Sequence, residues 1–177
     1  MGVEREANAM ETNPDEQPSG GLVRRVVAFD VGDRRIGVAV SDPLGFTAQP
    51  LFTLHRTGGK GGHRAEMKSV ARVLRKHSVA EAVVGNPLYM SGDQSPQAAK
   101  AQAFAEELRA EFGLVVHLWD ERLTTTEAHR HLDAGGHAAG HERRQIIDQV
   151  AAVLVLQSFL DARANQAARS AGTTGPE

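Results

Sequence analysis

The sequence predicts an α/β fold with a mixed sheet, in which three antiparallel strands are followed by parallel strands and helices pack on both faces. Two observations lead to this prediction. The first part of the chain contains short runs of β-forming apolar residues separated by tight turns, and the remainder alternates such runs with segments of helical periodicity. Antiparallel strands followed by alternating strands and helices are typical of a mixed sheet covered by helices.

Three short segments predict the antiparallel part of the sheet. Residues 26–29 form an apolar run that ends at Asp30, and residues 36–40 form a second one. The residues between these runs indicate a tight reversal, so the two strands are expected to pair antiparallel. Residues 51–54 are expected to add a third strand after the turn region that begins at Pro43.

Helical spacing and capping residues place the next three elements. Residues 63–77 are predicted to be a helix because their apolar side chains recur at core spacing, and residues 82–84 form a buried strand. Ser95 is expected to cap a second helix, which has Pro96 at its first position and Gly113 at its end.

The last part of the chain is predicted to contain one strand and two helices. Residues 114–119 have strand character, and Thr124 begins a capping-box pattern, so a helix is expected from there to Gly135-Gly136. The final helix is predicted over residues 142–163. The resulting order, βββαβαβαα, matches the ribonuclease-H-like architecture by analogy.

A single domain is predicted between two tails. A chain of 177 residues allows one domain with a hydrophobic core. Residues 1–21 are polar and contain prolines and glycines, and residues 165–177 are rich in small residues, so both are expected to be disordered. The predicted domain therefore covers residues 22–164.

The composition excludes several kinds of site and location. The chain has no cysteine, so disulfides, thiolate chemistry and cysteine-based zinc sites are excluded. We find no apolar run of membrane-span length and no signal peptide pattern, and therefore expect a cytoplasmic protein without membrane contact. The tails hold two of the 20 basic and six of the 22 acidic residues, so the domain carries a net charge of +2. This charge permits nucleic-acid binding without requiring it.

Carboxylates stand at the ends of two predicted strands. Asp30 ends an apolar strand, where an uncompensated charge is costly, although a turn aspartate that accepts backbone N–H bonds is an equally good interpretation. Asp120 and Glu121 end a second strand. Adjacent strand residues point to opposite faces, so only one of the two is expected to reach a given site, and the spacing does not decide which.

A third carboxylate continues an apolar helix stripe. Asp148 shares its face of the last helix with a set of core-type residues, Ala151, Ala152, Val155 and Phe159. An aspartate in such a stripe faces the protein and not the solvent. Complementation of the helix dipole is the alternative explanation, but that effect fades beyond the first turn.

Carboxylates from two strand ends and one helix can converge on hard divalent cations, which prefer oxygen ligands. We expect Mg²⁺ or Mn²⁺, as two ions about 4 Å apart that generate a hydroxide nucleophile and stabilise the departing oxygen of a phosphodiester. The absence of cysteine and of a Gly-x-Ser-x-Gly elbow is consistent with chemistry that needs no protein nucleophile.

A basic segment offers a surface for nucleic acid. Seven basic residues and one acid lie between Arg56 and Lys76, and four of them recur on one helix face, namely Arg64, Lys68, Arg72 and Lys76. The glycine-rich segment 58–62, which contains Lys60, is expected to be a mobile loop. This stripe suits a phosphate backbone, although basic helix faces are often only solvated. The 5% aromatic content favours recognition of shape and backbone over base stacking.

Four histidines in or near a glycine- and alanine-rich segment allow a weaker hypothesis. His137 and His141 have metal-compatible spacing, with His129 and His131 nearby. Glu142 is the acid next to the pair and cysteine is absent, so ordinary loop histidines are favoured over a zinc site.

Four motifs resemble the YqgF/RuvX family, whose members are described as pre-16S rRNA nucleases or as Holliday-junction-resolvase-like proteins. They are AFDVGDRRIGVAVSDP (28–43), VVGNPL (83–88), DERLTT (120–125) and IDQVAA (147–152), in the family's order. The resemblance implies a ribonuclease-H-like fold with Asp30, Glu121 and Asp148 as catalytic and metal-binding carboxylates. Asn86 departs from the leucine expected in this family, and Asp33-Arg34 replaces a small-basic pair.

The predicted function is metal-dependent endonucleolytic processing of the 5′ end of pre-16S rRNA in ribosome biogenesis. The partner is expected to be structured RNA of the pre-ribosome or branched DNA, bound by a monomer or homodimer. The residues assigned to nucleic-acid contact are Arg34, Arg35, Lys60, Arg64, Lys68, Arg122, Thr124 and Arg143.

Three other functions compete with this prediction. A Holliday junction resolvase would use the same metal chemistry, and a catalytically silent RNA-binding module would use the same fold. An actin-like or sugar-kinase-like ATPase would need a second lobe, for which this chain is too short.

Overall fold

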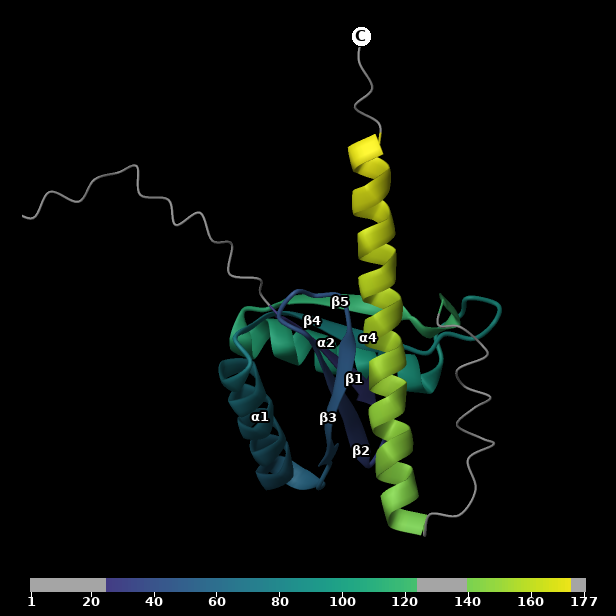
Figure 1. Ribbon diagram of the computed structural model, residues 1–177. Helices are drawn as coiled ribbons and strands as arrows, with labels where there is room; N and C mark the ends of the chain where they lie inside the picture. The colour runs from purple at the N-terminus through teal and green to yellow at the C-terminus, as the bar shows by residue number, and fades with distance from the viewer. Residues whose placement is uncertain (1–24, 124–139, 173–177) are drawn as a thin grey trace, which may run out of the picture.

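The computed structural model describes residues 25–123 and 140–172. Its elements in chain order are β1 (Arg25–Val31), β2 (Arg35–Ser41), β3 (Ala48–His55), α1 (Gly59–Lys76), β4 (Val79–Asn86), α2 (Pro96–Phe112), β5 (Val115–Asp120), the 3₁₀ turn η1 (Glu121–Leu123) and α4 (Gly140–Gly172) (Figure 1).

The strands form one five-stranded sheet in the order β3-β2-β1-β4-β5. β1 pairs antiparallel with β2, and β2 with β3, whereas β4 runs parallel to both β1 and β5. The carboxyl ends of β1, β4 and β5 therefore meet at one edge of the sheet. This arrangement confirms the predicted mixed sheet of antiparallel strands followed by parallel strands.

Each face of the sheet carries its own apolar layer. Val27 and Phe29 of β1 pack with α1 and α2, while the alternating residues Val26 and Ala28 pack with α4. The period of two follows from the strand geometry, which sends successive side chains to opposite faces. Figure 1 shows the resulting layers, with α4 as a long rod across one face.

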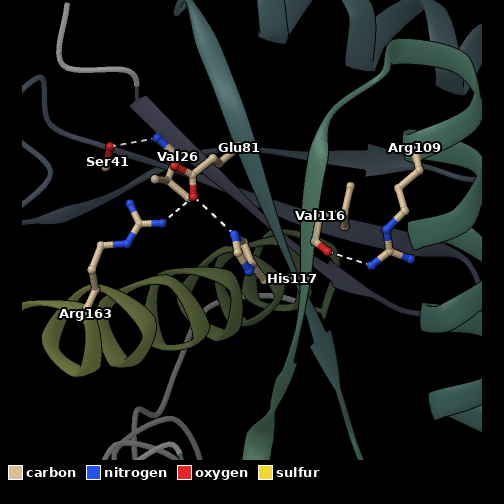
Figure 2. Close-up of polar contacts among 7 residues, drawn as sticks. All are labelled: Val26, Ser41, Glu81, Arg109, Val116, His117 and Arg163. Atoms are coloured by element: carbon tan, nitrogen blue, oxygen red, sulfur yellow. Dashed lines mark hydrogen bonds and ion pairs between the residues drawn. The ribbon is translucent and has the colours of Figure 1, made fainter. Parts of the chain in front are cut away.

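A polar cluster ties the C-terminal half of α4 to the sheet. Arg163 from α4 and His117 from β5 both contact the carboxylate of Glu81 on β4, with 3.1 Å between His117 Nε2 and Glu81 Oε2 (Figure 2). The Arg163 guanidinium also lies 4.8 Å from the ring centre of Phe159. Burial alone would raise the pKa of Glu81, but the hydrogen bonds and charges of Arg163 and His117 outweigh it and hold this pKa below its usual value.

The segment predicted to be a mobile glycine loop is instead the first turn of α1, which begins at Gly59. A Cβ atom at Gly62 would lie 1.7 Å from the main-chain oxygen of Thr57, so the close approach of this turn to the preceding chain requires glycine. Residues 59–62 are therefore helical, with Gly62 serving close packing, and the prediction of a loop was wrong for them.

Two other element bounds differ from the predictions. β3 is longer than residues 51–54 and includes Pro50, which is tolerated because β3 is an edge strand. α4 continues to Gly172, so residues 165–172, assigned to the C-terminal tail, are helical. This stretch is rich in alanine, the strongest helix former. Tail residues 1–21 and the helix expected from Thr124 lie outside the described residues.

The helix α4 also changes one expectation from composition. By length and apolar content alone, its part from Arg144 to Ala171 would suffice to cross a membrane. Ala152, Leu156 and Leu160 are, however, buried against the sheet, so part of this apolar content belongs to the core of the domain.

Candidate active site

Asp30 lies in β1 between two glycines of the neighbouring strands. It is the register partner of Gly37 in β2, and the parallel pairing of Phe29 with Val84 brings Gly85 of β4 alongside it. Asp30 points to the α4 face, as Ala28 does, because strand side chains alternate. At these two flanking positions, therefore, no side chain covers the Asp30 carboxylate.

Gly37 brings α4 into contact with the sheet beside Asp30. A Cβ atom at Gly37 would lie 1.9 Å from the main-chain oxygen of Asp148 and 2.5 Å from its carbonyl carbon. Only glycine permits this approach of helix backbone to strand backbone. The closeness of α4 places Asp148 next to Asp30, near enough for its charge to act on the Asp30 carboxyl group.

Gly85 makes the corresponding space for Glu121 on the other side of Asp30. A Cβ atom at Gly85 would lie 2.5 Å from Glu121 Oε1. Asp120, by contrast, is held by Arg122, whose main-chain N–H and Nε–H donate to Asp120 Oδ1 at 3.0 and 2.9 Å. Of the two adjacent acids, the one beside Gly85 and coupled to Asp30 is Glu121.

The central carboxyl groups hold protons more tightly than usual. Burial, followed by the charge of Asp148, raises the pKa of Asp30 to about 6. Burial raises the pKa of Glu121 to about 7, with further contributions from the charges of Asp30 and Asp120. A group of acids whose ionisation is opposed by burial and by mutual repulsion favours any cation that neutralises it.

The carboxylate of Asp148 is engaged by an arginine. Arg35 Nε donates to Asp148 Oδ2 at 2.5 Å, and both side chains are largely covered, with 24% and 21% of their surfaces exposed. Among the side chains that the structure describes, in residues 25–122 and 144–171, no three from His, Asp or Glu come close enough to hold one ion together. The three acids thus lie at one edge of the sheet but do not surround a single point at which one ion could bind. Asp148 is the acid whose carboxylate is hydrogen-bonded to Arg35.

The family model for RuvX, described as Holliday junction resolvase, matches residues 24–162. This match covers most of the chain and includes all three carboxylates.

The chain belongs to the RuvX family.

This finding confirms the resemblance drawn from the four motifs. A Moorella thermoacetica protein named "Putative pre-16S rRNA nuclease" is 47% identical over 137 residues, which cover 77% of this chain and 94% of the relative. A protein of the same name from Pelotomaculum thermopropionicum is 42% identical over 155 residues, or 86% of this chain and 98% of the relative. RuvX membership places the chain among nucleases, hydrolases that cleave phosphodiester bonds.

Solved structures support the fold of this RuvX member. RuvC from Thermus thermophilus in complex with a Holliday junction substrate aligns with a TM-score of 0.50 at 15% identity, covering 80% of this chain and 96% of that one. A second Thermus thermophilus RuvC structure gives a TM-score of 0.51. The similarity confirms the ribonuclease-H-like architecture.

A basic pocket lies next to Asp148 in this RuvX chain. Its volume is about 330 Å³, and its lining residues are Gly32, Asp33, Arg34, Arg35, Arg144 and Asp148. Arg34 and Arg144 are exposed, whereas Arg35 is partly covered by its contact with Asp148. Two of the residues predicted to bind nucleic acid, Arg34 and Arg35, therefore meet at the candidate site.

The predicted basic residues of α1 lie on the other side of the sheet. Lys60, Arg64 and Lys68 are exposed, as the spacing predicts. β3 ends at His55 opposite Arg35, so α1 begins near the edge that carries Asp30 and ends near the opposite edge. Lys60 and Arg64 are thus the members of the stripe nearest to the carboxylates.

The remaining predicted site residues have different outcomes. Arg122 forms an ion pair with Asp120 at 2.5 Å. Thr124, the side chain of Arg143 and the histidines His137 and His141 lie outside the part of the chain whose side chains are described.

Sequence reasoning missed three contributors to the site. Arg144 carried no distinguishing pattern, because arginines near a helix start are common. Gly37 and Gly85 did carry a signal, since a glycine inside an apolar strand often marks a close approach of another backbone or group.

Proposed function

We propose that this RuvX-family chain is a metal-dependent endonuclease that processes the 5′ end of pre-16S rRNA in the cytoplasm. The observation that carries the proposal is the position of Asp30 between two glycines, one of which admits Asp148 and the other Glu121. Three segments of the chain far apart in sequence thereby bring carboxylates to one edge of the sheet.

The donor set suits Mg²⁺ or Mn²⁺, which bind carboxylate oxygens. Asp30, Glu121 and Asp148 would hold such ions, and the space at Gly37 and Gly85 would be lost if either residue had a Cβ atom. When bound, divalent ions of this kind supply an activated water and stabilise the departing oxygen of a phosphodiester.

The residues of the site then have separate tasks. Asp30, whose ionisation is opposed by the charge of Asp148 and whose own charge opposes that of Glu121, would be the central ligand. Glu121 and Asp30 must lose their protons before they bind a cation, so binding strengthens as the pH rises through about 6 and 7. Arg34 and Arg35 provide positive charge for the phosphate backbone beside these acids.

Two observations bear on the substrate. The similar proteins from Moorella and Pelotomaculum carry the name of a pre-16S rRNA nuclease, which favours RNA. The RuvX model description and the fold of RuvC favour a four-way DNA junction as the second candidate. A junction resolvase would need two copies of the chain to cut two strands, whereas the processing of one RNA end needs only one.

Cleavage assays with matched variants test the proposal. A 5′ fragment of pre-16S rRNA and a synthetic four-way DNA junction are incubated with the wild-type chain, with Asp30→Asn and with Asp161→Asn in Mg²⁺ or Mn²⁺. Asp161 is an exposed acid on α4 that accepts a hydrogen bond from Gln157 and does not line the basic pocket, so its substitution is a control for the same chemical change. We expect the RNA to be cut by wild type and Asp161→Asn, and not by Asp30→Asn.

Other outcomes of this assay would change the proposal. Cleavage of the junction alone would favour the resolvase, and equal cleavage by wild type and Asp30→Asn would exclude the carboxylate site. Binding of RNA with no cleavage under any condition would favour a binding module on the same fold.

A further inference from the structure

Asp148 has two competing roles in this structure. In the proposed function it is a ligand for a divalent cation, together with Asp30 and Glu121. In the structure its Oδ2 accepts a hydrogen bond from Arg35 Nε at 2.5 Å. A guanidinium and a divalent cation are both positive and both draw on the negative charge of this carboxylate, so the Arg35 contact competes with cation binding through Asp148 Oδ2.

Arg35 would need a new partner once Asp148 turns to a cation. Only 24% of its side-chain surface is exposed, so a guanidinium left without an anion there would lose much of its solvation. The pocket around it offers no substitute, because its only other acid, Asp33, is already paired with Lys100. Lys100 holds the pKa of Asp33 below its usual value, which keeps that pair charged.

The turn that carries Arg34 and Arg35 is fixed by main-chain hydrogen bonds and by contacts with Arg56. Gly32 N–H donates to the Arg35 main-chain oxygen at 2.8 Å, which closes a tight turn. Arg56 braces that turn, because its main-chain N–H donates to the Arg34 oxygen at 2.9 Å and its side chain donates to the Gly32 oxygen at 3.3 Å. Arg56 is itself fixed by the buried Glu66 at 3.1 Å. The arginines are thus presented by a braced turn.

We propose that the pocket lined by Arg34, Arg35 and Arg144 binds one phosphate group of the nucleic acid, and that Arg35 moves from Asp148 to this phosphate when Asp148 binds a cation. The inference rests on the proposed function. A planar guanidinium suits a phosphate as well as a carboxylate, so Arg35 exchanges one anion for another without breaking its hydrogen-bonding geometry. Without a divalent cation, Arg35 blocks Asp148 and contributes nothing to nucleic-acid binding.

The first test measures Mn²⁺ binding by the free protein, with no nucleic acid present. Loss of the electron paramagnetic resonance signal of free Mn²⁺ is followed for wild type, Arg35→Gln and Arg144→Gln. Arg35→Gln removes the competitor of the ion and is expected to bind Mn²⁺ about tenfold more tightly, the factor that corresponds to one charge-assisted hydrogen bond. Arg144→Gln also removes one positive charge from the pocket but leaves the contact between Arg35 and Asp148 in place. A smaller change in Mn²⁺ affinity is expected for this variant.

The second test measures nucleic-acid affinity with and without a divalent ion. Anisotropy of a fluorescent RNA hairpin is recorded in EDTA and in Ca²⁺. We expect wild type and Arg35→Gln to bind equally in EDTA, and only wild type to gain affinity in Ca²⁺. Arg144→Gln should bind more weakly than wild type in both buffers.

A further variant guards against a simple folding defect. Asp148→Asn frees Arg35, so its RNA affinity in EDTA should exceed that of wild type, and the gain should disappear in Asp148→Asn/Arg35→Gln. Two results would overturn the exchange while the nuclease proposal stands. One is an equal Mn²⁺ affinity of wild type and Arg35→Gln. The other is a loss of RNA affinity in Arg35→Gln that has the same size in EDTA and in Ca²⁺. A wild-type chain that binds no Mn²⁺ would overturn both.

Discussion

Gly37 and Asp148 meet backbone to backbone, since a Cβ atom on Gly37 would lie 1.9 Å from the Asp148 main-chain oxygen. Gly37 is also the register partner of Asp30. One residue without a side chain therefore sets both the packing of α4 on the sheet and the distance between two candidate metal ligands.

The substitution Gly37→Ala should destabilise the protein. The atoms in the way belong to backbone and cannot swing aside, so α4 must shift, and overpacking of this kind costs about 1–3 kcal/mol. Urea unfolding measures the loss. Gly58→Ala is the matched control, because a Cβ atom there meets nothing within 4 Å, and a change as large as that of Gly37→Ala would contradict the explanation.

Gly85→Ala should affect ion binding more than stability. The nearest atom to the added Cβ is Glu121 Oε1 at 2.5 Å, which belongs to the far end of a long side chain, and Val155 Cγ2 follows at 3.3 Å. We expect Mn²⁺ affinity to fall at least ~10-fold, which is typical of changes to residues that position a metal ligand. The free energy of unfolding should fall less than in Gly37→Ala. Isothermal titration and urea unfolding of the same sample compare the two effects. Unchanged Mn²⁺ binding would remove Glu121 from the ligand set.

The raised pKa values predict an unusual pH dependence of stability without metal. A carboxyl group whose pKa is higher in the folded state stabilises the fold at low pH, and this contribution is lost as the pH rises from the unfolded pKa through the folded one. For Asp30 this window runs from 3.8 to about 6, and for Glu121 from 4.5 to about 7. Asp30→Asn should therefore raise the melting temperature at pH 8 more than at pH 4, in EDTA. An equal rise in melting temperature at both pH values would show that ionisation of Asp30 does not destabilise the fold.

The contacts of Glu81 predict a dependence of the opposite sign. Its pKa is lowered by Arg163 and His117 against the effect of burial, so its contribution is present above the unfolded pKa and is lost as the pH falls through the folded one. Glu81→Gln should cost up to about 1 kcal/mol at pH 7 and less on acidification, because all three side chains remain partly solvated. Glu106→Gln, which breaks the more exposed pair with Arg109, is the control and should cost less.

The position of α1 predicts a graded salt dependence of nucleic-acid binding. Arg64→Ala with Lys68→Ala should flatten the dependence of log K on log salt by up to about 1 per lost phosphate contact. Arg72→Ala with Lys76→Ala removes two charges from the same helix, but farther from the carboxylates, and should change the slope less. Equal slopes in both double variants and wild type would mean that the stripe is only solvated.

The sequence allowed much of the fold to be predicted because its strands obey local rules. The apolar run that ends at Asp30 and the tight turn before residue 36 produce the observed antiparallel pair. Ser95 caps α2 as expected, with its side chain accepting from the Ala98 N–H at 3.0 Å. Periodicity and capping act over a few residues, so they can be recognised without knowledge of the tertiary structure.

Features that depend on tertiary contact were predicted less well. Gly62 packs closely on Thr57, a residue outside the glycine-rich segment, so the composition of the segment alone does not indicate this contact. The choice between Asp120 and Glu121 came from the family resemblance, because strand parity could not decide it. The contact between Arg35 and Asp148 joins residues 113 positions apart, and no local pattern indicates it.

The anchoring of α4 at Glu81 has a consequence for the spacing of residues along that helix. Asp148 and Arg163 are 15 positions apart on one rigid rod, roughly 22 Å at 1.5 Å per residue. The contact between Arg163 and Glu81 fixes the rotation of α4 about its own axis. That rotation determines whether the Asp148 side chain points to the acids of the sheet. Inserting a single residue between them would turn the Asp148 carboxylate by about 100° around the helix axis. The length of this stretch should thus tolerate less variation than the identity of its solvent-facing residues.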